Sequence, residues 1–471
     1  MGYKTMAPAD FEALRHIVGD GGRLLTGDSV SEDYSHDELV GLNRWPDAVV
    51  KPLSTREVSE VMRFAWENNV PVTPRGAGTG LVGAAIPVEG GILLDMSLMN
   101  RFLELDEDNL TLTVEPGVLL MEVTAFAEGR GFFYPPDPGE KTATIGGNIS
   151  TNAGGMRAVK YGVTRDYVRG LEAVLPDGGI IELGGKIVKN SSGYDLKDLL
   201  IGSEGTLAVI TKATLKLLPL PAKTISLLVP FPSLELAIGA VPKIIRAKAP
   251  PNAIEFMERE VILDAEEYLG KAFPDHSSPA YLLLRFDGQA TADVERDYDG
   301  TARICLEEGA LDVLISDTPE RDESIWNARG AFLQAIKNAA PAIEEIDAVV
   351  PRDRVSELVG YTHAVQKEKR VRIKCFGHAG DGNLHIYILK DDADGAAWAQ
   401  KARDAMDSIY QCVKALGGQV SGEHGIGYDK RAYLSGSLSE TALGLMRGIK
   451  NVFDPKNILN PAKIFLDEPR P

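Results

Sequence analysis

A glycine-rich stretch framed by apolar runs constrains the fold of this chain more than any other feature. Residues 139–205 hold 14 glycines in 67 positions, about 21%, against about 7% in average proteins. Apolar runs border this stretch and Pro135, Pro136 and Pro138 stiffen its entry, so we expect ordered loops here. Ordered loops this rich in glycine allow the backbone to lie close against a flat ligand, and a flavin with its pyrophosphate suits them.

A second glycine cluster lies at residues 76–83. Gly78, Gly80 and Gly83 spell GxGxxG, but the sequence then continues through Pro87 into another apolar run at 92–95. A Rossmann site needs a helix to begin at these glycines, so the context excludes that fold. We predict instead a loop whose successive backbone N–H groups form a nest for an anion.

Charge and cysteine content narrow the functional class. Lys and Arg number 50 and Asp and Glu 68, so the formal charge is 50 − 68 = −18, which disfavours nucleic acid and anionic lipid as partners. We see no apolar signal region and no transmembrane segment. Three separated cysteines without a CxxC pair exclude an iron–sulfur cluster and a disulfide framework, so we expect a cytoplasmic protein.

The order of apolar runs and helical patterns predicts three regions in an α+β protein. Residues 1–40 form an N-terminal helical segment, and 41–221 alternate short strands with glycine-rich turns around a helix at 54–68. A proline-studded linker at 218–221 leads into 222–466, where strands alternate with long helices. That pattern predicts an α+β cap domain with a mostly antiparallel sheet.

Three of the seven histidines fall in two compact motifs. His378 and His385 flank a Gly-Asp-Gly turn, so their ring nitrogens can converge on one cation, and Glu423 precedes His424 in a Ser-Gly-Glu-His-Gly motif. Two imidazoles and one carboxylate match a catalytic transition-metal site that leaves positions open for substrate. Histidines that serve only as structural hydrogen-bonding groups are the alternative.

Segments 74–85, 135–155 and 189–211 resemble the FAD-binding domain of the vanillyl-alcohol oxidase (PCMH) superfamily. The branch is that of D-lactate dehydrogenase, D-2-hydroxyglutarate dehydrogenase and the FAD-linked chain of glycolate oxidase. The resemblance implies a two-subdomain PCMH-type FAD domain followed by an FAD-linked oxidase cap. It implies FAD-binding residues at Pro74, Arg75, Gly76, Ala77, Gly78, Thr79, Gly80, Leu81, Pro136, Asp137, Gly139, Thr142, Gly146, Gly147, Asn148, Thr151, Asn152, Gly154, Glu204, Gly205, Ile210 and Asn460. Residues 75–82 lack the histidine that often links FAD covalently in such proteins, so we expect non-covalent FAD.

The same resemblance assigns roles in the C-terminal half. His378, His385 and Glu423 are similar to the ligands of one divalent transition metal (Zn, Fe or Mn), His424 to the general base, and Arg329 to the arginine that binds the substrate carboxylate. The acidic stretch around Glu345 stands where enzymes for 2-hydroxyglutarate carry a lysine, and Tyr387 where they carry an asparagine. A substrate with one carboxylate is therefore favoured.

Together these features predict a dehydrogenase that oxidises a small D-2-hydroxy acid, with D-lactate as the leading candidate and glycolate next. The resemblance points most closely to lactate dehydrogenase subunits that pass electrons to an electron-transferring flavoprotein. An iron–sulfur subunit, as in glycolate oxidase complexes, is the alternative acceptor. A non-catalytic flavin-binding subunit and a non-redox FAD enzyme like the alkyl-ether lipid synthases are the competing hypotheses.

Overall fold

The computed structural model describes residues 2–19, 21–316, 318–390 and 395–466, which form two compact units. The first unit comprises Met1–Ala153, Val163–Leu220 and His424–Pro471, and the second Gly154–Gly162 and Pro221–Glu423. These units differ in part from the boundaries that the sequence suggests, because residues 424–466 belong to the first unit. No helix among the described residues is both long enough and apolar enough to cross a membrane.

The first sheet of the first unit has four strands in the order β1-β2-β4-β3. Its strands β2, β4 and β3 are parallel, and β1 pairs antiparallel with β2. The segment expected to be helical at 1–40 is therefore only partly so, since β1 lies within it. The elements are β1 (Leu24–Thr26), β2 (Ala48–Val50), β3 (Val72–Arg75), β4 (Ile92–Asp95), α1 (Pro8–Val18) and α2 (Thr55–Asn68).

Helix α2 shows how the sequence directs this part of the fold. Ser54 caps its N-terminus by accepting a hydrogen bond from the Glu57 backbone N–H, and Asn69 ends it in the left-handed conformation. The apolar residues between these caps recur every three or four positions, as an amphipathic helix requires. Those that face the core are Val58, Val61, Met62 and Ala65.

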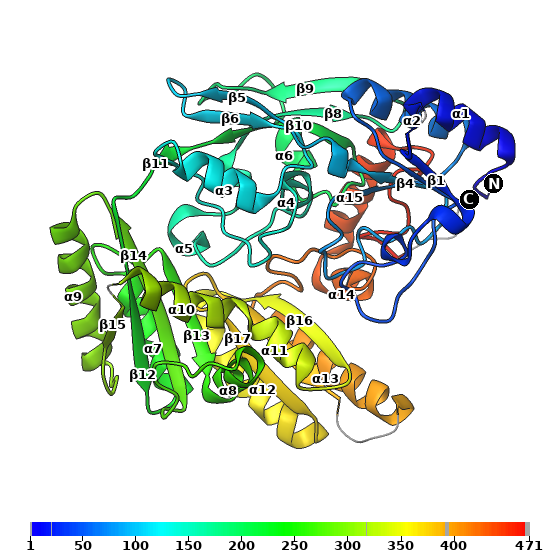
Figure 1. Cartoon of the computed structure of the whole chain (residues 1–471). Coiled ribbons are helices and arrows are strands. Elements are labelled where there is room, and N and C mark those ends of the chain that lie inside the picture. Colours follow the sequence, from blue (N-terminus) through cyan, green and yellow to red (C-terminus); the bar gives the residue numbers. More distant parts are fainter. Residues whose placement is uncertain (1, 20, 317, 391–394, 467–471) are drawn as a thin grey trace. The chain divides into compact units, whose positions relative to one another are not determined.

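The second sheet of the first unit has five antiparallel strands in the order β5-β6-β10-β8-β9 (Figure 1). A short pair, β7 and β11, precedes the passage into the second unit. The elements are β5 (Phe102–Asp106), β6 (Thr111–Val114), β7 (Phe132–Phe133), β8 (Val168–Val174), β9 (Ile180–Gly184), β10 (Val209–Lys216), β11 (Leu218–Pro219), α3 (Leu120–Glu128), α4 (Ile145–Thr151), α6 (Leu196–Leu200), α14 (Arg431–Ser437) and α15 (Glu440–Phe453).

The second unit is built on a seven-stranded sheet in the order β15-β12-β14-β13-β17-β18-β16. All of its pairings are antiparallel, which confirms the predicted α+β class with an antiparallel C-terminal sheet. The strands are β12 (Lys223–Phe231), β13 (Ala253–Glu258), β14 (Ala280–Gly288), β15 (Leu314–Ser316), β16 (Ile343–Val349), β17 (Arg372–His378) and β18 (Asn383–Leu389).

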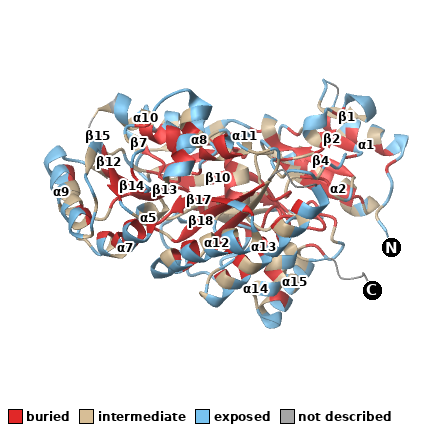
Figure 2. Cartoon of the chain, turned by 90° about the horizontal axis from the view of Figure 1, so that it is seen from below, coloured by how far each residue is buried: buried red, intermediate tan, exposed pale blue. Residues whose placement is uncertain are grey.

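Helices cover both faces of this sheet, whose central strands are buried (Figure 2). On one face lie α7 (Leu234–Ile245), α9 (Thr291–Glu307), α12 (Val355–Lys369) and α13 (Gly395–Ala415). On the other lie α8 (Arg259–Leu269), α10 (Pro319–Gly330) and α11 (Phe332–Asn338), packed on an apolar core that includes Phe376 and Tyr387. The short α5 (Ala158–Tyr161) also belongs to this unit.

Candidate functional site

The turn between β17 and β18 brings the two predicted histidines together. His378 ends β17, and His385 lies on β18 opposite Phe376. Since alternate residues of a strand share a face, the His378 and His385 side chains both point to the face that α8, α10 and α11 cover. Gly382 closes the turn with a φ of 92°, and a Cβ there would lie 2.1 Å from the Val350 carbonyl oxygen.

His378, His385 and Glu423 place three ligand atoms around one point. The two Nε2 atoms are 3.4 Å apart, and Glu423 Oε1 lies 3.4 Å from His378 Nε2 and 3.3 Å from His385 Nε2. An ion with metal–ligand bonds of about 2.0–2.1 Å in tetrahedral geometry separates its ligands by about 3.3–3.4 Å. The spacing of these three side chains, which we call the triad, therefore fits the ligands of a divalent transition metal.

Glu255, on β13, links the triad residue His378 to Arg329. Its Oε1 accepts a hydrogen bond of 2.7 Å from His378 Nδ1, and its Oε2 accepts bonds of 2.9 and 2.5 Å from Nε and Nη2 of Arg329. The carboxylate is fully buried, and the Arg329 side chain is 7% exposed. A carboxylate on the far nitrogen of a ligand histidine fixes the ring so that the other nitrogen faces the metal.

Asp347, on β16, secures the loop that carries Glu423. Its buried Oδ2 accepts hydrogen bonds from Ser421 Oγ (2.8 Å) and from the backbone N–H groups of Gly422 and Glu423 (3.0 Å each). Its Oδ1 accepts from Asn383 and lies 4.0 Å from His385 Nδ1. One side chain therefore fixes the position of Glu423 and also faces the second histidine.

Buried carboxylates and imidazoles in and beside the triad shift one another's pKa values. Burial disfavours a charged imidazole at His378, but the carboxylates of Glu255 and Glu423 outweigh it and raise its pKa well above the ordinary value. Burial likewise opposes ionisation of Glu423, yet the two imidazoles hold its pKa well below the ordinary value. The Glu423 carboxylate therefore stays anionic beside the two imidazoles.

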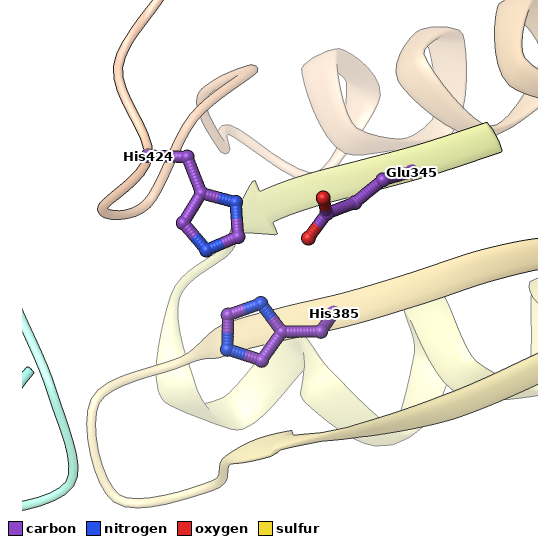
Figure 3. Close-up of side chains that lie close together, drawn as sticks. All are labelled: Glu345, His385 and His424. Atoms are coloured by element: carbon purple, nitrogen blue, oxygen red, sulfur yellow. The ribbon is translucent and has the colours of Figure 1, made fainter. Parts of the chain in front are cut away.

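A further acid–tyrosine pair lies beside the triad. Tyr387 on β18 donates a hydrogen bond of 2.9 Å to Glu345 on β16, and ligand atoms of Glu345 and His385 lie within 4.8 Å (Figure 3). Burial raises the pKa of Tyr387, and the neighbouring Glu345 raises it further. His424, also drawn in Figure 3, follows Glu423 in the chain and belongs to the first unit.

The predicted flavin-binding segments meet within the first unit. A Cβ on Gly76 would lie 2.1 Å from Thr144 Oγ1, which caps α4, and a Cβ on Gly205 would lie 3.2 Å from Pro74. The structure thus joins the loops around 74–81, 142–152 and 204–210. The Arg75 guanidinium donates to the carbonyl oxygens of Asp33 and His36 and lies against Gly78 of the loop, where a Cβ would come within 2.0 Å of Nη2.

Glu204 and Asn460 join the same region through the backbone. Glu204 is buried at a φ of 52°, and its carboxylate accepts bonds from the N–H groups of Ile426 (2.8 Å) and Gly427 (2.7 Å). Asn460, at a φ of 44°, donates to the carbonyl oxygens of Ala84 and Glu204. Such strained conformations cluster at ligand sites, so the segment is a suitable neighbour for a cofactor.

Gly154, predicted to contact FAD, belongs to the second unit and lies against Glu423 of the triad. A Cβ on Gly154 would approach Glu423 Oε2 to 2.7 Å, so glycine is needed there for the carboxylate to keep its place. Sequence reasoning missed Glu255 and Asp347. Each is an acid that occupies a core-facing position of a strand, and a charge among apolar strand residues is the signal that could have found them.

Two family models match the chain. The FAD binding domain matches residues 46–184, and the C-terminal domain of the FAD linked oxidases matches residues 220–464, more than half of the chain. The chain belongs to the FAD-linked oxidase family. It is therefore an FAD-linked oxidoreductase, as the sequence predicts.

Relatives within this family match over nearly the whole chain. A protein named D-lactate dehydrogenase from Anaerostipes hadrus is 45% identical over 98% of both chains. A protein named glycolate oxidase subunit GlcD from Bacillus subtilis is 41% identical over 93% of both. The solved structure of p-cresol methylhydroxylase with substrate bound superposes with a TM-score of 0.80 at 16% identity, covering 99% of both chains, and this confirms the PCMH fold.

Proposed function

We propose that this FAD-linked oxidase is a metal-dependent dehydrogenase of small D-2-hydroxy acids, with oxidation of D-lactate to pyruvate as the leading reaction. The triad is the observation that carries this proposal. Its three ligand atoms lie 3.3–3.4 Å apart and are held by buried carboxylates, as a catalytic metal site requires. The names of the relatives support the substrate class.

The reaction removes the hydroxyl proton and the Cα hydrogen of the substrate, the latter as a hydride, to give a 2-oxo acid. FAD, when bound, supplies the hydride acceptor at N5. A divalent cation held by His378, His385 and Glu423 would lower the pKa of a hydroxyl group beside it. His424 is proposed as the base that takes the hydroxyl proton, a role worth roughly 10²–10⁴-fold in rate.

Arg329 and Glu345 are proposed to select the substrate. Arg329 directs two of its nitrogens to Glu255, and Nη1 is the nitrogen that we assign to the substrate carboxylate. Glu345 lies near His385 and would repel a second carboxylate at the far end of a dicarboxylic acid. These two charges together favour a monocarboxylate such as lactate or glycolate.

The electron acceptor is proposed to be a separate protein, either an electron-transferring flavoprotein or an iron–sulfur subunit. Three cysteines are too few for the usual four-thiolate cluster, so the chain would not carry its own iron–sulfur relay. A role as the glycolate-oxidising chain of such a complex is the second candidate, supported by the 41% identity to the protein named glycolate oxidase subunit GlcD.

Anaerobic reduction of the FAD-loaded protein by a panel of D- and L-2-hydroxy acids tests this function. We expect D-lactate to bleach the flavin absorbance fastest, glycolate to follow, and D-2-hydroxyglutarate to be slow. Bleaching by L-lactate alone would overturn the stereochemical assignment, and bleaching by none of the acids would overturn the function.

The His424→Ala variant tests the proposed base. We expect bleaching by D-lactate to fall at least about 100-fold while FAD remains bound, because proton transfer to a positioned imidazole is lost. Retained bleaching in this variant would assign the proton to another group.

A further inference from the structure

Glu255 joins two groups that the proposed function treats separately. One carboxylate oxygen accepts from the metal-ligand candidate His378, and the other accepts from Arg329, the candidate for substrate binding. The Glu255 carboxylate has 0% exposed area, and it contacts both His378 and Arg329. A shift of this side chain therefore displaces both partners.

The partners are themselves held in place, so Glu255 has little freedom. The register of β13 and β17 sets Glu255 directly opposite His378. The Arg329 guanidinium lies 4.6 Å from the ring centroid of Phe376 and 5.5 Å from that of Phe332. Glu255 is thus fixed by a strand pairing on one side and a stacked arginine on the other.

We infer that Glu255 is a positioning residue that couples Arg329 to the metal site, an inference that rests on the proposed function. Glu255 holds the Nδ1–H of His378 and so keeps the Nε2 lone pair directed at the triad. Arg329 in turn anchors Glu255 through two charge-assisted hydrogen bonds to one oxygen. Arg329 therefore acts on metal affinity through Glu255, without contact with the metal.

The same strand supplies a matched control. Glu258, also on β13, accepts a hydrogen bond of 2.8 Å from His363. This pair has the same chemistry as Glu255 and His378, but His363 is not part of the triad. A carboxylate-to-amide change at 258 removes a Glu–His contact without touching the proposed site.

Zn²⁺ affinity of the FAD-loaded protein, measured by competition with a chelator, is the test. We expect Glu255→Gln to weaken binding about 10–100-fold and Glu258→Gln to change it less than about twofold. The Co²⁺-substituted protein gives an independent signature, because its visible absorption should change in Glu255→Gln and stay native in Glu258→Gln. Native affinity and a native spectrum in Glu255→Gln would overturn the inference.

A double-mutant cycle tests the coupling itself. Arg329→Met should weaken Zn²⁺ binding in the native background and have no further effect in Glu255→Gln, whereas additive losses would refute coupling through Glu255. The double variant also removes the buried charge that Glu255→Gln leaves unpaired, so it serves if the single variant does not fold. Native Zn²⁺ affinity in a folded double variant would also refute the inference. If the native protein itself does not bind Zn²⁺, the proposed metal site is refuted instead.

Discussion

At the scale of single residues, two buried carboxylates hold the side chains of the proposed site in position. Glu255 and Asp347 are both fully buried, and each carboxylate accepts several hydrogen bonds. The histidine pair and Glu423 were predictable because their motifs are local in sequence. Glu255 was not, because it lies 123 positions from His378 and only the strand register brings them together.

Gly154→Ala tests the packing around Glu423. The new Cβ would lie 2.7 Å from Glu423 Oε2 and 3.1 Å from its Cβ, so the Glu423 side chain must shift from its present position. We expect Zn²⁺ affinity, measured by chelator competition, to fall about tenfold or more. Gly300→Ala in α9, where a Cβ meets open space, is the control and should bind Zn²⁺ as the native protein does. Native affinity in Gly154→Ala would show that Glu423 does not depend on this contact.

Lys463 gives a pH-dependent prediction in the first unit. Burial lowers the pKa of its amine from 10.5 to about 7, against the opposing charges of Asp37 and Glu204. Between these values the unfolded chain binds more protons, so the contribution of Lys463 to stability increases as pH rises. Lys463→Met lacks this dependence. We therefore compare the midpoint temperatures of thermal flavin release in the variant and the native protein. The variant's midpoint minus the native midpoint should decrease as the pH rises from about 7 to about 10. A difference that is independent of pH would contradict the shifted pKa.

At the scale of elements, strong patterns were predictable and short or irregular elements were not. The predicted helix at 54–68 matches α2 to within a residue because its cap and its apolar spacing agree. Strand β1 was missed because three half-buried residues give no periodic signal. Strand β16 has no simple apolar alternation, because Glu345 and Asp347 occupy the positions opposite Tyr387 and His385.

Asp347→Asn tests whether the Asp347 side chain on β16 fixes the loop at 421–423 through its hydrogen bonds. The amide has one acceptor oxygen and one donor NH2 group, so in either orientation the NH2 group faces donors: Asn383 Nδ2 at the Oδ1 position, or the three loop donors at the Oδ2 position. We expect hydrogen exchange at Gly422 and Glu423 to become at least about tenfold faster, measured by mass spectrometry of peptides across 416–424.

Asp287→Asn is the reciprocal control for this experiment. Asp287 on β14 accepts hydrogen bonds from Lys160 and Tyr161 of α5 and from Asn252, rather than from the loop at 421–423. Exchange should accelerate around α5 and remain native at 421–423. Equal acceleration of the loop in both variants would mean that Asp347 has no particular role there.

For the whole molecule, the sequence predicted the α+β class and the family, because long motifs in order identify both. It did not predict that residues 424–466 return to the first unit. There Val72 donates to the Ile458 carbonyl oxygen and accepts from the Asn460 N–H, so this segment extends the first sheet. The chain passes between the units at Glu423–His424, the dipeptide to which the proposed function assigns both a metal ligand and the base.

Metal titration of the stripped enzyme tests the central claim most directly. FAD-loaded protein freed of metal by a chelator would be mixed anaerobically with D-lactate, and the rate of flavin bleaching followed as Zn²⁺ or Mn²⁺ is added back. The proposed triad predicts bleaching at least about 100-fold slower without metal, restored in proportion to added metal up to one equivalent per FAD. Bleaching at the native rate in the metal-free enzyme would contradict the account.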